Sequence, residues 1–313
     1  MILDDGPSSE IKIVIAGNAA VDLTFVVEHY PGANDKCSAI GFTRRPGGQG
    51  VNMAIASARL GVSCALVTKV GADDDGAFVV AELARHGVRT DGIVRETGGR
   101  TPIVSIIVDQ AQDTRACVHD KTGLTPLSAD ETELGLAKGA QVILVDGRFP
   151  QVCRALAELA RNEGARVVAT VERITDDIRA LSSVADVLIM PSSLVETMHP
   201  SAGTIEASRS TRNELGAPTA IVTLGAKGCV VIDEIGTHQL DGYSAEVVDS
   251  VGAGDAFAAA VTLGLAWGWP AVIAADFANY VGARACEGTS DRWSGIPERP
   301  TKEEARALIS RLS

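Results

Sequence analysis

Short apolar runs of strand length alternate with amphipathic or small-residue segments of helical length along most of the chain. Strands that are separated by helices predict a parallel sheet with right-handed crossover connections. The 313 residues are enough for one large α/β domain with a sizeable core. The strands are expected at residues 11–16, 64–70, 142–146, 166–171, 187–190 and 220–224, and the helices at residues 53–60, 76–86, 151–162, 176–183, 206–215, 256–267, 271–286 and 303–312.

Two stretches interrupt this alternation. Residues 36–45 alternate loosely between apolar and polar side chains, and residues 101–119 contain two strand-like runs around a polar turn at 109–114. No helix separates these two runs, which is typical of a hairpin. We therefore expect a small sheet beside the main one, where it covers a substrate or pairs with another subunit.

The stretch Asp249-Ser-Val-Gly-Ala-Gly-Asp255 opens a long apolar helix. Gly252 and Gly254 allow the backbone to approach a ligand closely, and the free N–H groups around Ala253 favour negative charge at the helix start. Asp255 is either a helix-capping residue or a general base. Because a cap requires no Gly-Ala-Gly before it, we favour a base beside an anion site that holds the charge of a transferring phosphoryl group.

A second glycine-rich stretch, Pro46-Gly-Gly-Gln-Gly-Val-Asn52, precedes a small-residue helix that ends at Gly61. Gly48-x-Gly50 matches the dinucleotide fingerprint only weakly, since the third glycine is absent and no βαβ strand precedes it. A close backbone approach to a small polar ligand, with Asn52 as a two-way hydrogen-bonding group, fits better. The alternative is that Asn52 caps the helix.

Three further positions follow predicted strands. Asp22 lies within a few residues of the first strand, where open α/β sheets bind ligands, and is either a ligand contact or a turn residue. Val145-Asp-Gly-Arg148 ends a later strand, so Arg148 is expected at the ligand-facing edge of the sheet. Thr223-Leu-Gly-Ala-Lys-Gly228 makes a tight turn between the strand at 220–224 and a run at 229–233, which suits the edge of a nucleotide or a simple β-hairpin.

Composition narrows the range of partners. The net charge of −12 argues against nucleic acid and against an anionic membrane surface. The six cysteines have no Cys-x-x-Cys spacing, and the first 12 residues lack the apolar core of a signal peptide, so we expect a cytoplasmic protein with reduced cysteines. No uncharged apolar run approaches the length of about 18 residues that a membrane helix needs. Phosphate-binding P-loop, zinc-site and serine-hydrolase motifs are also absent from the sequence.

The two glycine-rich motifs, residues 47–52 and 249–255, resemble the two signatures of the ribokinase-like carbohydrate kinases, the PfkB family. Their order, the early strand with Asp22 and the turn at 223–228 also match, so the resemblance covers nearly the whole chain. It implies a doubly wound α/β domain with helices on both faces and a β-sheet lid, which often serves as a dimer clasp. It also implies ATP as phosphoryl donor and Mg²⁺, with K⁺ as a candidate activator.

The resemblance further implies roles for individual residues. Asp255 looks like the base that takes the proton from the sugar hydroxyl, and Gly252, Ala253 and Gly254 look like the anion hole. The implied sugar contacts are Asp22, Gly48 and Asn52, and the implied ATP-site residues are Thr223, Gly225, Gly228 and Asn279.

One departure from the family pattern concerns the metal. The family commonly carries an Asn-x-x-Glu near the metal and phosphates, whereas the matching region here is Pro191-Ser-Ser-Leu-Val-Glu196, without the asparagine. Glu196 is thus only an approximate match to the residue that organises Mg²⁺, and its alternative is a surface carboxylate on a helix. Mg²⁺ held mainly by nucleotide phosphates and water agrees with its hydrated character.

Two cations indicate the kind of sugar. In the ketohexokinase and sulfofructose kinase branches of the family a similar strand end carries an arginine like Arg148, and Lys36 is similar to a lysine of the sulfofructose kinase pattern. Together they imply a ketose such as fructose or sulfofructose, gripped by a guanidinium fork and a point charge. An equally weighted alternative is that Lys36 is a solvated loop lysine and Arg148 pairs with a neighbouring carboxylate.

Other functions remain as alternatives. A ribokinase or an adenosine-type nucleoside kinase would share the fold. A non-catalytic sugar or nucleotide sensor would not need Asp255 beside an intact Gly-Ala-Gly turn, and a nicotinamide-dependent oxidoreductase is disfavoured by the incomplete fingerprint. We expect a sugar kinase that forms a homodimer through its lid.

Overall fold

The computed structural model describes residues 12–112, 114–288 and 292–309. These residues form a nine-stranded sheet in the order β13-β12-β11-β10-β9-β8-β1-β4-β5. Neighbouring strands pair in parallel, except that β12 is antiparallel to both β11 and β13. The strands are β1 (Lys12–Ala16), β4 (Ser63–Gly71), β5 (Ile93–Glu96), β8 (Val142–Val145), β9 (Arg166–Thr170), β10 (Val187–Pro191), β11 (Thr219–Thr223), β12 (Cys229–Ile232) and β13 (Thr237–Leu240).

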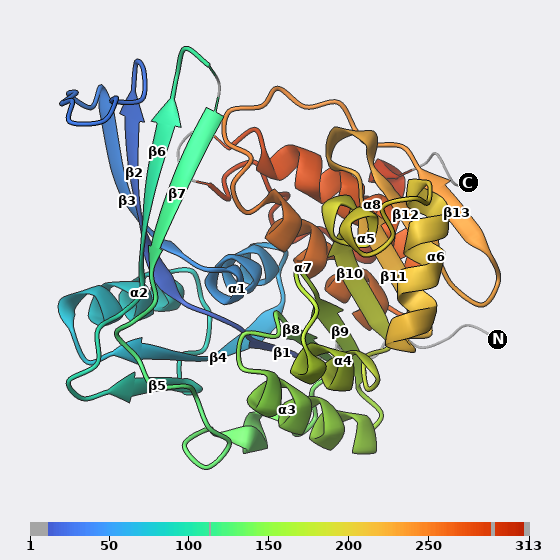
Figure 1. Cartoon of the computed structure of the whole chain (residues 1–313). Coiled ribbons are helices and arrows are strands. Elements are labelled where there is room, and N and C mark those ends of the chain that lie inside the picture. The colour runs from blue at the N-terminus through green and yellow to red at the C-terminus, as the bar shows by residue number, and fades with distance from the viewer. Residues whose placement is uncertain (1–11, 113, 289–291, 310–313) are drawn as a thin grey trace.

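Helices cover both faces of this sheet, which confirms the doubly wound α/β fold (Figure 1). Alternate side chains of β1 enter two separate cores. Ile13 and Ile15 pack with α1, α7 and α8, whereas Val14 and Ala16 pack with α3, α4 and α6. The helices are α1 (Gln49–Arg59), α2 (Asp74–Arg85), α3 (Pro150–Asn162), α4 (Asp176–Ser182), α5 (Ser192–Met198), α6 (Thr204–Leu215), α7 (Ala253–Ala266), α8 (Ala271–Ala285) and α9 (Lys302–Leu308), with short 3-10 turns η1 (Leu134–Ala137) and η2 (Gly225–Lys227).

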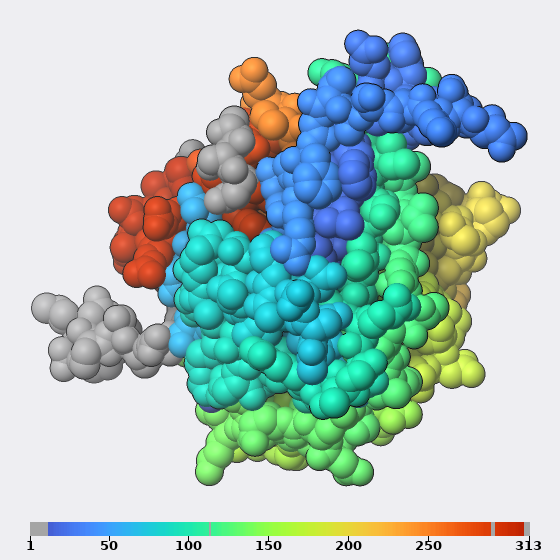
Figure 2. All heavy atoms as spheres, turned by 90° about the vertical axis from the view of Figure 1, so that its left-hand side faces the viewer, coloured from blue at the N-terminus to red at the C-terminus, as the bar shows by residue number. Residues whose placement is uncertain are grey.

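A second sheet of four strands, ordered β3-β2-β6-β7, forms the lid. Its strand β2 pairs antiparallel with β3 and parallel with β6, and β6 and β7 form an antiparallel hairpin. Figure 2 shows that the blue part of the lid stands out from the upper edge of the molecule. The lid strands are β2 (Ala20–Val27), β3 (Gly41–Gly47), β6 (Ile103–Asp109) and β7 (Thr114–Asp120).

The lid is larger than the sequence predicts. The sequence predicts a turn after Ala16, whereas the chain bends over only three residues, 17–19, and continues as the lid strand β2. Asp22 therefore lies within a lid strand rather than in a turn. Residues 36–40, expected to begin a lid strand, lie in the loop before β3. The short strands β5 and β13 were not predicted either, because a few residues carry too little periodicity to be recognised. The short helix α5 was expected only as the alternative interpretation of Glu196.

The strand order reverses at β1. The chain moves from β1 outward to β4 and β5, and then returns to the other side of β1 through β8. Ligands of open α/β sheets bind beyond the carboxyl ends of the strands at such a point. Here β2 leaves the carboxyl end of β1 for the lid, so that the lid stands beside this edge. Among the described helices, none has the length and hydropathy needed to span a bilayer.

Candidate active site

The start of α7 forms an open cradle of backbone N–H groups. Gly252 precedes the helix with φ 81°, a left-handed conformation that favours glycine. Within the described part of the chain, the N–H groups of Gly254 and Asp255 have no backbone partner, since the first helical bond is donated by Ala256 to Gly252. A Cβ at Gly254 would meet no atom within 4 Å. The helix start therefore faces open space and can receive an anion.

Asp255 lies beside this cradle as the third residue of α7, so it is not the helix cap. Its Oδ2 accepts a hydrogen bond of 2.8 Å from Nδ2 of Asn52. Burial raises the pKa of Asp255 to about 7, the Asn52 hydrogen bond and the charge of Arg292 oppose the rise, and the charges of Glu172 and Asp146 add to it. A carboxyl group with this pKa can accept a proton near neutral pH.

A buried arginine that the sequence did not single out joins Asp22 to Asn52, which itself contacts Asp255. Nη1 of Arg292 lies 2.9 Å from Oδ2 of Asp22 and 3.3 Å from Oδ1 of Asn52. The Arg292 side chain is 2% exposed, and its Cδ would lie 3.2 Å from a Cβ at Gly252. Asn52 sits in the first turns of α1 behind the cap residue Gly48, so it is not a cap. The expected residues Asp22, Asn52 and Asp255 are thus joined in one chain of polar contacts.

Glycines at and before the start of α1 allow this helix to lie close to the ends of β1 and β2. A Cβ at Gly47 would overlap the carboxylate of Asp22, and a Cβ at Gly50 would lie 2.6 Å from the backbone of Gly17. Gly48 has φ 90°, and a Cβ there would lie 2.7 Å from the backbone oxygen of Asn18. Residues with side chains at these positions would separate α1 from the ends of β1 and β2. Gly48 therefore lies where α1 meets the chain after β1, and its expected contact with the sugar stays a prediction.

Two further carboxylates lie at this edge of the sheet. Asp146, directly after β8, accepts hydrogen bonds of 2.8 Å from the N–H groups of Asn18 and Arg148, while burial raises its pKa to about 6. Glu172, after β9, accepts a hydrogen bond of 2.9 Å from the Gln49 side chain. Its Oε2 lies 3.9 Å from Nη2 of Arg148. Arg148 is therefore at the ligand-facing edge, as predicted, and its weak ion pair with a neighbouring carboxylate matches the alternative interpretation as well.

Most of the residues expected to bind the nucleotide lie around the turn between β11 and β12. These two strands form an antiparallel hairpin, which was one of the two interpretations of residues 223–228. Thr223 ends β11, and Gly225 and Gly228 have φ 62° and 93°. A Cβ at Gly228 would overlap the backbone of Leu240, so this glycine is needed for the turn itself. Asn279, on α8, is buried with its Nδ2 3.5 Å from Sγ of Cys229.

Glu196 lies on α5 and accepts a hydrogen bond of 2.9 Å from Thr204 Oγ1. With Ser192 and Lys227 it lines a cavity of about 610 Å³ beyond the ends of β10 and β11. The described residues contain no group of three His, Cys, Asp or Glu side chains that could hold a metal by themselves. Glu196 is exposed on α5, which agrees with the alternative of a surface carboxylate on a helix, and a role in holding Mg²⁺ stays a prediction.

Lys36 is not brought to the site within one chain. It is exposed in the loop between β2 and β3, where its N–H donates to the Asp35 side chain. Figure 1 shows this loop at the far end of the lid. Its expected contact with a substrate therefore finds no support in the single chain.

Residues 10–298 match the family described as pfkB family carbohydrate kinase. The chain belongs to this family. It is accordingly an ATP-dependent phosphotransferase of the carbohydrate kinase type, as the two glycine-rich motifs indicated. The match includes every candidate residue described above, from Asp22 to Arg292.

Individual relatives differ in their substrates. The ATP-dependent ribose-1-phosphate kinase of Halopiger xanaduensis is 26% identical over 96% of this chain and 98% of its own length. Fructokinase-2 of Solanum habrochaites is 27% identical over 97% of this chain and 98% of its own length. The ribokinase of Arabidopsis thaliana, solved with ribose and ATP, has a TM-score of 0.80 at 20% identity and covers 96% of this chain and 99% of that one. These likenesses support the fold and the family, and they leave the sugar open.

Proposed function

We propose that the chain transfers the γ-phosphoryl group of Mg²⁺-bound ATP to a hydroxyl of a sugar, with Asp255 as the general base. The observation that carries this proposal is the position of Asp255. It is a carboxyl group with a pKa of about 7, held by Asn52 and placed beside the unpaired N–H groups of a helix start. A base next to an anion cradle is what phosphoryl transfer to an alcohol requires.

In the proposed reaction, the Asp255 carboxylate takes the proton of the attacking hydroxyl. The hydroxyl oxygen forms a bond to the γ-phosphorus as the bond to the bridging oxygen breaks, and that electron pair leaves with ADP. The backbone at Gly252, Ala253 and Gly254 holds the negative charge that develops on the transferring group. Asn52 holds the carboxylate in place by its 2.8 Å hydrogen bond.

Sugar binding is assigned to Asp22, Gly48 and Asn52. The carboxylate of Asp22 can accept hydrogen bonds from two hydroxyl groups, and Asn52 can donate and accept. Both side chains are engaged by Arg292, so sugar hydroxyls would share or replace these contacts. Pre-paired polar groups at the base of the site keep its geometry fixed before the sugar arrives.

The nucleotide is placed along Thr223, Gly225 and Gly228, with Asn279 behind them. Mg²⁺ bound to the phosphates would neutralise their charge, with Glu196, which lines one cavity together with Lys227 of this turn, as a candidate carboxylate. K⁺ as an activator stays a candidate that adding the ion to the assay can test.

A ketose such as fructose or sulfofructose is the proposed substrate, since Arg148 lies at the ligand-facing edge. Ribose and adenosine are the alternatives. One similar protein is named a fructokinase and another a ribose-1-phosphate kinase. Similar proteins are therefore named for both neutral and charged sugars.

The experiment is a coupled assay of ADP release with fructose, sulfofructose, ribose and adenosine. We expect the highest kcat/KM for one of the ketoses. A preference for adenosine would contradict the substrate proposal and leave the kinase activity standing. If no sugar in a broad panel supports ATP consumption, the proposed function is contradicted.

A further inference from the structure

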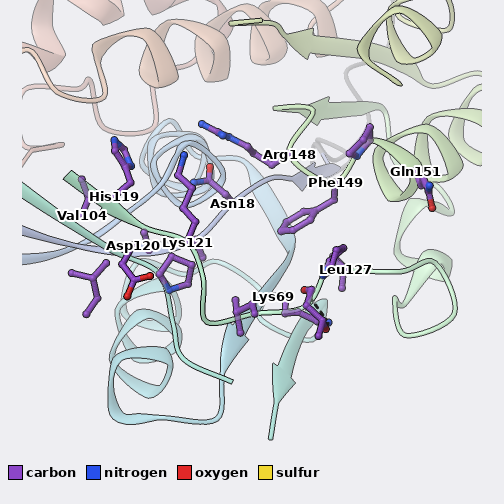
Figure 3. A pocket seen from close by; sticks show the side chains of 18 of the residues that line it. Asn18, Lys69, Val104, His119, Asp120, Lys121, Leu127, Arg148, Phe149 and Gln151 are labelled. Atoms are coloured by element: carbon purple, nitrogen blue, oxygen red, sulfur yellow. Dashed lines mark hydrogen bonds between the residues drawn. The ribbon is translucent and has the colours of Figure 1, made fainter. Parts of the chain in front are cut away.

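A cavity of about 450 Å³ lies under the lid, between the hairpin β6–β7 and the loops that follow β8 and β9. Three cationic side chains from separate parts of the chain line it: Lys121 after β7, Arg148 after β8 and Arg173 after β9. His119 of β7 lines it as well. Figure 3 shows the nitrogen-bearing ends of Lys121, Arg148 and His119 on one side of the cavity and Lys69 and Leu127 on the other.

The charges on that side are only partly compensated. Within the described residues, Lys121 and Arg173 form no ion pair, and Arg148 has only the 3.9 Å contact with Glu172. Lys69, by contrast, is paired with Glu96 at 3.1 Å and Glu131 at 2.9 Å.

Two carboxylates line the cavity against four cationic side chains. Asp120 lies 3.5 Å from Arg100, which leaves Asp177 as the other carboxylate that lines the cavity. The cations are near enough to affect one another. Partial burial lowers the pKa of Lys121, the positive charges of Arg148 and Arg173 lower it further, and the charge of Glu172 opposes them. Burial and the charges of Lys121 and Arg148 lower the pKa of His119 in the same way.

The backbone adds to this positive character. Helix α3 begins at the cavity wall, where Phe149, Pro150 and Gln151 line the space. The first residue of this 13-residue helix, Pro150, has no N–H group, and no side chain caps the N–H groups that follow it. The helix dipole therefore contributes to the same region as the three cations.

The cavity lies beside the proposed transfer site, and Asp146 connects the two. Asn18 and Arg148 line it, and the N–H groups of both donate to Asp146, whose charge raises the pKa of Asp255. The charge of Glu172, which lies beside Arg148, also raises the pKa of Asp255. Asp22 pairs across the lid sheet with Val104, which lines the cavity, so the proposed sugar contact lies near the cavity too. A ligand held at Asp22 and Asp255 could extend directly toward the three cations.

We propose that this cavity is a subsite for a negatively charged group of the sugar substrate, held by Lys121, Arg148 and Arg173 and distant from the hydroxyl that is phosphorylated. The proposal rests on the proposed function, because it names the class of sugar for the same site. Phosphate, sulfonate and carboxylate groups share the required chemistry, since each accepts charge-assisted hydrogen bonds from guanidinium and ammonium groups.

The test compares neutral and charged forms of one sugar. Fructose, fructose 6-phosphate, sulfofructose and a keto-sugar acid are assayed for kcat/KM, and the same compounds and inorganic phosphate are titrated calorimetrically without ATP. The variants are Lys121→Met, Arg173→Met and the double variant. Arg166→Met is the matched control, because this exposed arginine lies at the opposite end of β9 and carries the same charge change.

We expect a charged sugar to have a higher kcat/KM than fructose, and the three charged compounds identify which anionic group is used. Loss of one charge-assisted contact should lower the preference for that sugar over fructose about 10- to 150-fold. Arg166→Met should leave the preference as it is. Equal use of fructose and all charged sugars, or an unchanged preference in the double variant, would overturn the subsite.

Calorimetry separates the two proposals. If no sugar is phosphorylated but a charged sugar binds and Lys121→Met weakens it, the subsite stands and the proposed function fails. If fructose is phosphorylated and no charged compound binds more tightly than fructose, the kinase stands and the subsite fails. Binding of inorganic phosphate alone, with no gain from the sugar part, would also contradict a substrate subsite.

Discussion

The proton affinity of Asp255 is set by a few neighbours with opposite effects. Burial raises its pKa most, the Asn52 hydrogen bond and Arg292 act against this, and Glu172 and Asp146 act with it. The resulting value of about 7 lies near the pH at which a general base works best. The same carboxyl group in open solvent would be a much weaker base.

The first prediction concerns the pH dependence of the reaction. Because Asp255 must be ionised to accept a proton, kcat/KM should fall as the pH drops below about 7. Glu172→Gln removes a negative charge, so the pKa of Asp255 should fall and the acidic limb should move to lower pH. Arg292→Met removes a positive charge, so the limb should move to higher pH. The measurement is the position of the limb in each variant, independent of the level of activity.

Arg292→Met also leaves Asp22 buried without its partner, so its thermal stability must be measured in parallel. Arg292→Lys keeps the charge and serves as the control for the position of the limb. Shifts in the same direction for Glu172→Gln and Arg292→Met would contradict the electrostatic account of Asp255.

Sequence patterns revealed some of these residues and concealed others. Asp255 and Asn52 could be found because glycines at fixed spacing precede them and a helix follows. Arg292 could not, since it is a single arginine in a polar stretch and its contacts with Asp22 and Asn52 span 270 and 240 residues. Glu172 follows a predicted strand, as Arg148 does, and this shared position was the available signal.

At the scale of elements, the start of α7 is the part of the fold on which the proposed reaction depends. The backbone at residue 252 is left-handed, which favours glycine, whereas Gly254 lies in the helix with open space where a Cβ would be. The two glycines therefore serve different purposes. Gly252 shapes the turn, and Gly254 leaves room in front of the N–H groups.

The second prediction tests whether the open space at Gly254 is needed for the reaction. Gly254→Ala should keep or raise the thermal stability, because alanine is favoured over glycine in helices by up to about 1 kcal/mol. Its methyl group should displace the phosphoryl group, and a misplacement of this kind can lower the rate on the order of 100-fold. Gly236→Ala, in the turn between β12 and β13, also enters open space and is the control. Full activity in Gly254→Ala would contradict the role of the α7 start as the anion cradle.

The elements themselves were largely predictable, and the exceptions have physical causes. The helices of the two cores show apolar or small residues over many positions, so their patterns are strong. β2 was missed because the glycine at residue 17 indicates a strand end, while the chain only changes sheets there. Sheet membership depends on distant partners such as β3 and β6, which no local pattern encodes.

At the scale of the whole molecule, the lid presents an apolar surface to solvent. Every residue of the edge strand β7 is exposed, and Val118 is 68% exposed. Phe42 of the other edge strand, β3, is 57% exposed, and Ile40 before it is 56% exposed. The mostly apolar residues 103–107, by contrast, belong to the interior strand β6, where Ile103 and Val104 line the cavity.

The third prediction is that the chain forms a dimer through these edges, since an exposed apolar edge strand favours pairing. Sedimentation velocity at micromolar concentration should show a dimer, and Val118→Lys should shift it toward the monomer. Val247→Lys, at a residue that is 64% exposed outside the lid, is the control. A monomer at all concentrations tested would contradict dimer formation through the lid. A dimer would also be the setting in which Lys36, at the far end of the lid, could reach a site.

The most direct test of the account is single-turnover phosphoryl transfer by Asp255→Asn with ATP and the best sugar at saturation. Asparagine can still accept the Asn52 hydrogen bond but cannot take the proton, so transfer should slow about 10²- to 10⁴-fold with ATP binding retained. The raised pKa of Asp255 means that its charge destabilises the folded state above pH 7, so the variant should be at least as stable as the parent at pH 8. Transfer at a rate close to that of the parent, in a folded variant that binds both substrates, would contradict Asp255 as the base.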